Sequence, residues 1–182
     1  MNRLHRKAPF RLALLGLALA AAPAAAGEPL GSDLFAGYSY LKLAEVSRSG
    51  ANLASDFHAF GPIAGFVDAS AHWGSDSGTS IRDWTLMAGP GVRIGNRGGT
   101  LLFVRVLAGV LSDHTSISVL DVDISEGSTR FAILAGGGVD VRIAARLALR
   151  AQGDYLWYDA TSGSTSGFRV SGGLVYRIGT AP

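Results

Sequence analysis

Apolar and polar residues alternate along most of the chain after its first thirty positions, which is the period of a β-strand rather than of a helix. In the last such segment, Gly167–Gly179, Phe168 and Val170 fall on one face while Arg169 and Arg177 fall on the other. Each of the last six segments has one face without any charged residue. With two weaker segments before them, the pattern predicts eight strands, at residues 33–43, 52–60, 63–73, 83–94, 102–113, 130–143, 147–158 and 167–179.

The connections between these strands alternate in length. Those at 61–62, 95–100 and 144–146 are short, whereas those at 44–50, 74–80, 112–127 and 160–166 are longer and polar. Short turns at one end and long loops at the other are typical of outer-membrane barrels. Segments of about ten residues are long enough to cross a bilayer as tilted strands. The predicted fold class is therefore all-β, an eight-stranded antiparallel up-and-down transmembrane β-barrel.

A soluble periplasmic barrel of the lipocalin type would give the same alternation, with the apolar face turned inward. Three features favour the membrane form. The connections alternate in length, and aromatic residues such as Trp73, Trp84 and Trp157 lie on the apolar face near strand ends, where interfacial girdles form. The apolar face also carries Gly and Ala in mid-strand, which would fill a ligand-binding core poorly. The soluble barrel is kept as an alternative.

The first 26 residues have the pattern of a secretory signal peptide. Four of the 16 basic residues precede position 12, Leu12–Ala22 is apolar, and Ala24–Ala26 supplies a small-residue cleavage site. The uncharged stretch Leu12–Gly27 has 16 residues, fewer than the roughly 20 that a spanning helix needs. We therefore predict cleavage near Ala26, a β-barrel domain at residues 27–182, and location in the outer membrane of a diderm bacterium.

The basic balance of the whole chain comes from this leader. From Gly27 onward there are 12 Lys and Arg against 14 Asp and Glu, so the net charge of +2 becomes −2 and no basic patch suggests nucleic acid. The chain has no Cys, which excludes a disulfide scaffold, thiolate metal sites and a cysteine nucleophile.

Seven short motifs occur in order along the chain. They are residues 33–41 (DLFAGYSYL), 68–72 (DASAH), 88–90 (AGP), 136–142 (GGGVDVR), 147–150 (LALR), 154–155 (DY) and 172–177 (GGLVYR). Together they resemble the small eight-stranded outer-membrane barrels, the OmpA-like transmembrane domain and its relatives, over nearly all of residues 27–182. The resemblance implies a membrane-embedded protein without a cofactor, in a group whose members mostly have no defined molecular role and are sometimes tied to adhesion, envelope integrity or serum resistance. The chain ends in Ile178-Gly-Thr-Ala-Pro182, so Tyr176 is the nearest candidate for the C-terminal aromatic that insertion machinery recognises.

In an eight-stranded barrel the lumen is just wide enough for side chains to fill it. The charged strand faces therefore predict a structural polar network inside, formed by Lys42, Asp68, Ser70, His72, Asp83, Arg93, Arg105, Arg130, Asp140, Arg142, Arg150, Asp154, Arg169 and Arg177. With Asp113, the charged positions are eight basic and five acidic. Buried charges must pair, and we expect pairs of Asp140 or Asp154 with Arg142, Arg150 or Arg169. The basic excess leaves a small anion-preferring pore as an alternative.

Candidate chemistry is sparse. Asp68, Ser70 and His72 alternate along one strand, but neighbours in this row are about 6.8 Å apart and all face the lumen rather than lipid. This arrangement favours a hydrogen-bond network over catalysis by an outer-membrane lipid-modifying enzyme, which is the alternative function. Asp121, Asp123, Ser125 and Glu126 offer oxygen ligands that would suit Ca²⁺, but they form an incomplete calcium-loop pattern and read as a solvated loop. We predict no catalytic residue, no metal site and no cofactor.

The favoured function is a non-enzymatic envelope scaffold that displays surface loops. Its expected partners are outer-membrane lipid, including lipopolysaccharide, and the barrel-assembly machinery. The sequence does not identify a partner for the surface loops.

Overall fold

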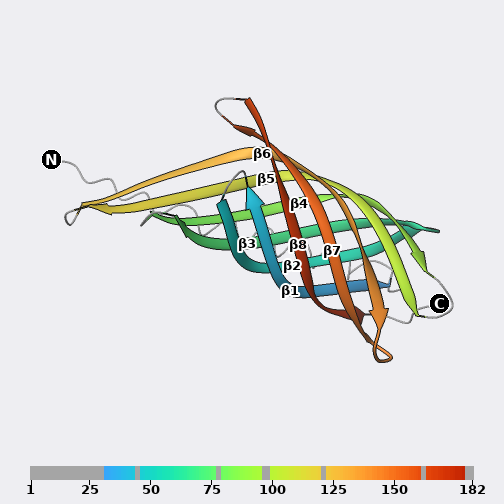
Figure 1. Ribbon diagram of the computed structural model, residues 1–182. Helices are drawn as coiled ribbons and strands as arrows, with labels where there is room; N and C mark the ends of the chain where they lie inside the picture. Colours follow the sequence, from blue (N-terminus) through green and yellow to red (C-terminus); the bar gives the residue numbers. More distant parts are fainter. Residues whose placement is uncertain are drawn as a thin grey trace, which may run out of the picture.

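The computed structural model describes residues 31–43, 46–76, 79–95, 99–119, 122–160 and 163–178. They form eight strands (Figure 1): β1 (Ser32–Leu43), β2 (Val46–Phe60), β3 (Ile63–Asp76), β4 (Thr79–Gly95), β5 (Thr100–Val119), β6 (Val122–Arg142), β7 (Leu147–Ala160) and β8 (Gly163–Ile178). The predicted signal peptide and its cleavage site lie outside the described residues.

Each strand pairs antiparallel with the next one in the chain, and β8 pairs with β1 to close the barrel. Closure removes the unpaired sheet edges that an open sheet would expose. The predicted all-β, eight-stranded up-and-down barrel is thus confirmed. Within the described residues, no helix is long and apolar enough to cross a membrane.

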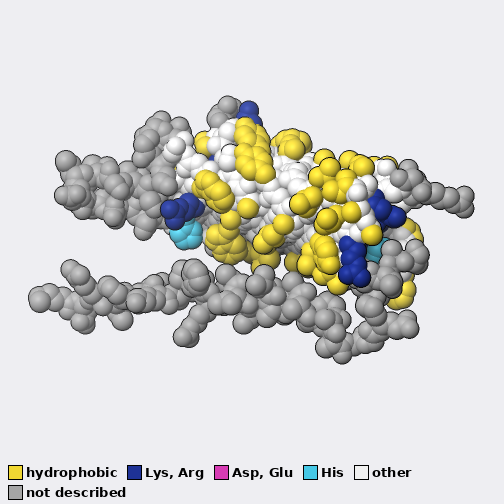
Figure 2. All heavy atoms as spheres, turned by 90° about the horizontal axis from the view of Figure 1, so that it is seen from below, with side chains coloured by type: hydrophobic (Ala, Val, Ile, Leu, Met, Phe, Trp, Pro, Cys, Tyr) yellow, Lys and Arg dark blue, Asp and Glu magenta, His cyan; other side chains and the backbone are white. Residues whose placement is uncertain are grey.

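The strand faces follow the alternation of the sequence. On β5, Leu102, Val104 and Val106 point outward and each is more than half exposed, whereas Phe103 and Arg105 between them are buried. The same holds on β8, where the charged face points inward. The aromatic residues Trp73, Trp84, Phe131, Tyr155, Trp157, Phe168 and Tyr176 are all on the outside. Figure 2 shows hydrophobic side chains spread over much of the face that it draws, with backbone and small residues between them.

The strands are longer at one end than the sequence pattern predicted. Residues 46–50, 112–119 and 122–127, expected in long loops, belong to β2, β5 and β6. The polar residues of these segments favour a loop, but the segments also contain Val, Ile and Thr, which favour extended backbone. β5 and β6 remain paired along their full overlap, up to Val119 opposite Val122. In Figure 1 this hairpin extends well past its neighbours.

Apolar side chains fill much of the interior between the charged groups. One buried cluster combines Leu41, Leu43, Ala64, Phe66, Met87, Phe103, Leu107, Leu111, Ala132, Leu134 and Leu156. A smaller one combines Phe35, Ala54, Ala148 and Val175. Glycines line the wall where these groups need space. A Cβ on Gly136 would lie 2.3 Å from Asp154 Oδ1 and 2.4 Å from the Gly153 carbonyl oxygen. The lumen is therefore a packed core.

Candidate functional site

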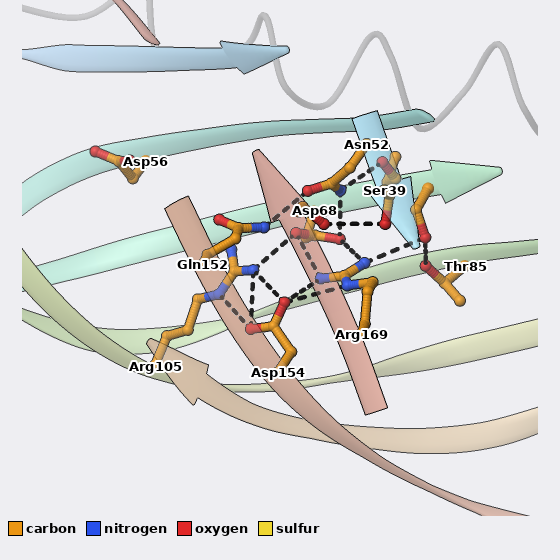
Figure 3. Close-up of polar contacts among 12 residues, drawn as sticks. Ser39, Asn52, Asp56, Asp68, Thr85, Arg105, Gln152, Asp154 and Arg169 are labelled. Carbon is orange, nitrogen blue, oxygen red and sulfur yellow. Dashed lines mark hydrogen bonds and ion pairs between the residues drawn. The ribbon is translucent and has the colours of Figure 1, made fainter. Parts of the chain in front are cut away.

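Four charged side chains form a ring at the centre of the lumen (Figure 3). Asp68 projects from β3, Arg105 from β5, Asp154 from β7 and Arg169 from β8. Arg105 Nη2 lies 3.1 Å from Asp68 Oδ2 and 3.0 Å from Asp154 Oδ2. Arg169 closes the ring, with Nη1 2.7 Å from Asp68 Oδ1 and Nη2 2.8 Å from Asp154 Oδ2. Because β3 is opposite β7 and β8, the ring ties facing walls together.

The opposite charges alternate around this ring, and each of the four residues is at most 2% exposed. Two planar guanidinium groups each contact both carboxylates, the arrangement in which Arg forms its strongest charge-assisted hydrogen bonds. A buried ion pair repays its desolvation only when the geometry is this complete. The ring therefore acts as a crosslink across the lumen.

A second network lies closer to the end of the barrel where β1 begins and β8 ends. Arg93 on β4 donates hydrogen bonds to Asp33 on β1 and Asp56 on β2. Arg150 on β7 then connects Asp56, at 3.0 Å, to Asp140 on β6, with Nε 2.7 Å from Asp140 Oδ1. The Arg150 guanidinium also lies 4.6 Å from the centre of the Phe103 ring. Five charges from five strands are thus linked in one chain across the barrel.

Neutral polar side chains link the central ring to the wall. Gln152 Nε2 donates to Asn52 Oδ1 at 2.8 Å, and Asn52 Nδ2 donates to Asp68 Oδ1 at 3.0 Å. The hydroxyls of Ser171 and Ser39 are 2.9 Å apart, and Ser39 is also 2.9 Å from His72 Nε2. The polar interior is thus cross-linked through amides and hydroxyls as well as through charges.

Two further pairs lie toward the end that carries the long β5–β6 hairpin. Arg48 on β2 binds Asp83 on β4, and Arg130 on β6 lies 3.6 Å from Asp113 on β5, both partly exposed. Arg130 also lies over the ring of Tyr158. In total, six arginines and seven aspartates make the ion pairs of the described residues.

Most of the sequence-predicted network lies inside the lumen, but three positions differ. Lys42 is exposed on the outer face, because the inward positions of β1 are Leu41 and Leu43. Arg142 is exposed at the end of β6, beside the turn that contains Gly99. Arg177 is half-buried and forms no ion pair within the part of the chain that the structure describes. Both expected pairs of Arg142 are therefore wrong, whereas Arg150–Asp140 and Arg169–Asp154 are present.

The sequence reasoning missed several inward residues on the two weakest strands. Asp33 on β1 and Asp56, Asn52 and Arg48 on β2 all take part in the networks above, as does Gln152 on β7. Asp33 and Asp56 are opposite each other in the β1–β2 register. They lie on the same strand faces as Phe35 and Ala54, and this alternation is the sequence signal that could have assigned them to the lumen. With these two aspartates and Arg48 added, and with the exposed Lys42 and Arg142 left out, the inward charges are seven arginines against seven aspartates, so the basic excess that was the premise of an anion-preferring pore is absent among the described residues.

Asp68, Ser70 and His72 are all buried, but they do not form a triad. Asp68 is bound by Arg105 and Arg169, and the Ser70 hydroxyl is 2.7 Å from that of Thr85 on the next strand. His72 contacts Ser39 rather than Ser70. A nucleophile, its base and the group that orients the base need consecutive hydrogen bonds, and these three side chains each bond elsewhere.

The acidic segment lies in the long hairpin. Asp123, Ser125 and Glu126 belong to β6 rather than to a loop, and Asp121 lies outside the described residues. Within the described part of the chain, no group of three His, Cys, Asp or Glu side chains is placed to hold a metal ion.

Comparison with solved structures identifies similar folds. Neisserial surface protein A superposes with a TM-score of 0.56 at 13% identity, covering 81% of this chain and 96% of that one. Ail, the attachment invasion locus protein of Yersinia pestis, gives 0.56 at 16%, covering 80% and 98%. The N-terminal β-barrel domain of Pseudomonas aeruginosa OprF gives 0.51 at 14%, covering 84% and 100%.

No protein-family model and no curated protein sequence matches the chain. The expected resemblance is confirmed at the level of structure, since these neighbours are small eight-stranded barrels like the one described here. At identities of 13–16% the likeness concerns the fold alone. The chain thus has the fold of small eight-stranded outer-membrane barrels.

Proposed function

We propose that the chain is an integral outer-membrane protein, inserted with its strand ends at residues 61–62 and 143–146 toward the periplasm. The short connections at these ends and the long β5–β6 hairpin at the opposite end support the orientation, and the distribution of polarity supports insertion. Leu102, Val104, Val106 and Ile133 project outward and are 39–60% exposed, whereas the ion-pair networks lie inside. In water such a surface would be a large apolar patch, and in a bilayer it is a lipid-facing belt.

The predicted leader fits this location. A signal peptide at residues 1–26 would direct the chain across the inner membrane, and the aromatic side chain of Tyr176, outward on β8, would serve in recognition by the barrel-assembly machinery. Both steps are part of the proposal.

Within the membrane, we infer a non-enzymatic scaffold that presents hairpins at the cell surface, with attachment as its role. The observation that carries this is the β5–β6 hairpin. On the β7 side, pairing of β6 ends at Ala132 opposite Tyr158, so among the described strands residues 122–131 of β6 pair with β5 alone. Such a strand edge presents free backbone donors and acceptors to a partner chain. The similar barrel of Yersinia pestis is named for attachment and invasion, which agrees with this role.

Cell fractionation tests the location. The protein should remain with outer membranes, and in gels it should migrate differently before and after boiling. Recovery from the periplasm without detergent would refute the proposal and favour the soluble barrel.

Replacing residues 115–126 by a two-residue Asn-Gly turn tests the role. The barrel below His114 and Gly127 keeps its pairing, so the shortened protein should still insert and show heat-dependent mobility. We expect cells carrying it to lose attachment to surfaces or host cells, whereas a variant with the same residues in scrambled order serves as the control for length. Unchanged attachment of the shortened variant would contradict the proposed role.

A lipid-modifying enzyme is the second candidate, motivated by Ser70 and His72 on one strand. Mass profiles of lipid A from cells with and without the gene separate the two functions. We expect identical profiles, and a lost or added acyl chain would overturn the scaffold function.

A further inference from the structure

An arginine, a histidine and an indole stand side by side on the outer surface of the barrel. Arg82 on β4 lies opposite Trp73 on β3 and opposite His114 on β5. Cα partners in neighbouring strands present their side chains to the same face. All three residues are exposed, Trp73 by 56%.

Arg82 and His114 differ from the inward charged residues in having no acidic partner among the described residues. The buried arginines of the lumen each contact one or two aspartates. Arg82 and His114 form no ion pair or hydrogen bond within the part of the chain that the structure describes. No acidic side chain is visible among the coloured residues of this face in Figure 2. The donors of Arg82 and His114 are therefore available to an external anion.

Gly127 on the next strand provides space for the histidine. It lies opposite His114 in register, and a Cβ at this position would be 3.0 Å from His114 Nε2 and 3.2 Å from its Cδ2. The imidazole therefore lies across β6 where a side chain would otherwise stand. The surface formed by Arg82 and His114 therefore extends from β4 to β6 and is bounded by Trp73 on β3.

The position along the barrel indicates what binds there. On the outer face of β4, Arg82 is followed by Trp84, and then by Leu86, Ala88 and Val92, so the cation stands at the polar edge of the apolar belt. Trp residues mark the interface between hydrocarbon and headgroups. The edge is the one nearest the β5–β6 hairpin, which is the cell-surface side under the proposed function.

We propose that Arg82, His114 and Trp73 bind a phosphate of the phosphorylated glycolipid of the outer leaflet, the lipid A part of lipopolysaccharide. The inference rests on the proposed membrane orientation. An Arg guanidinium pairs with phosphate oxygens in a bidentate manner. Neighbouring strands are about 4.8 Å apart, so His114, one strand from Arg82 and with its imidazole over β6, stands beside the headgroup whose phosphate Arg82 binds. The indole, with an apolar ring and one N–H donor, suits the boundary between acyl chains and sugar.

Native mass spectrometry of the purified full chain measures this binding. The protein, taken from detergent, is mixed with hexa-acylated lipid A bisphosphate or with chemically dephosphorylated lipid A, and retained lipid is counted. The test variant is Arg82→Gln with His114→Gln. Lys42→Gln is the matched control, because Lys42 is an outward cation on β1 beside Phe168, away from this cluster.

We expect the wild type and Lys42→Gln to retain the bisphosphate, and the double variant to lose roughly tenfold in affinity, the loss of one charge-assisted contact. Dephosphorylated lipid A should bind with equally low affinity to the wild type, to Lys42→Gln and to the double variant. Equal retention by the double variant, or equal loss in Lys42→Gln, would overturn the site. Each variant is first checked for heat-dependent mobility in phosphatidylcholine vesicles. A wild type that fails to insert there refutes the membrane function, while insertion with unchanged lipid A binding refutes only this inference.

Discussion

Single charged residues inside the barrel are stabilised by their partners, because little water reaches them. Arg169 holds both acidic members of the central ring and is 2% exposed. Arg177, also inward on β8, is half-buried and has no ion pair among the described residues. Two arginines of one strand thus have different energetic roles.

Replacing Arg169 by Met should destabilise the barrel by about 3–5 kcal/mol, because Asp68 and Asp154 then share a single arginine in a buried site. Arg177→Met, the matched change on the same strand, should cost at most about 1 kcal/mol. Urea titration followed by the mobility of unboiled samples measures both. Equal costs would show that the ring is no crosslink.

Adding a charge on the outer face tests which side chains point toward lipid. Val139 lies on the outer face of β6, between Leu102 on β5 and Ala151 on β7. An arginine there should cost about 2–4 kcal/mol, the penalty for a cation at mid-membrane depth on the lipid face. Ile143→Arg, on the same face but at the strand end, should cost about 0–1 kcal/mol. A folding titration in lipid vesicles that gives the same value for both would contradict the face assignment.

Residue placement could be predicted from the sequence wherever only one strand face is apolar. On β8 and β5 the alternation assigns every charge correctly. On β1 both faces carry apolar residues, since Phe35, Leu41 and Leu43 point inward and Leu34, Tyr38 and Tyr40 outward. Lys42 was assigned to the lumen because of its charge alone, and that assignment is wrong. The pairing partners could not be predicted, because they depend on register across the lumen.

The sequence pattern predicts the strands themselves better than it predicts where they end on the side of the β5–β6 hairpin. The number and order of strands were correct, but the segment 112–127 was expected as a loop. Local polarity does not distinguish a solvated loop from a strand that continues beyond the membrane, since neither face is then covered by lipid. The β5–β6 pairing that extends both strands is a property of two segments together.

The glycine run 136–138 shows how an element is adapted to the narrow lumen. Gly136 and Gly138 face inward, and a Cβ on Gly138 would lie 2.5 Å from the carbonyl oxygen of Ala151. Gly136→Ala should therefore cost about 1–3 kcal/mol through overpacking against Asp154 and the β7 backbone. Gly172→Ala is the control, since the nearest atom to its Cβ, the Arg150 carbonyl oxygen, is 3.8 Å away. Thermal unfolding of both variants decides the point, and an unaffected Gly136→Ala would contradict the tight packing.

At the scale of the whole molecule, the barrel is balanced in charge and closed by its own side chains. The sequence count suggested a basic interior, whereas the ion pairs of the described residues join six arginines to seven aspartates. Arg93 and Arg150 close the lumen where β1 begins and β8 ends, the central ring closes the middle, and Leu107, Leu134 and Leu156 fill the space on the hairpin side of the ring. We expect such an interior to keep the barrel rigid and to conduct ions poorly.

Planar-bilayer recording tests this closed scaffold most directly. The protein is purified from outer membranes in detergent and checked for heat-dependent mobility, so that inserted barrels are known to be present. We expect no conductance steps above the bilayer leak at any holding potential that the membrane withstands. Steady, reproducible open-channel steps from the wild-type protein would contradict the plugged lumen and with it the scaffold function.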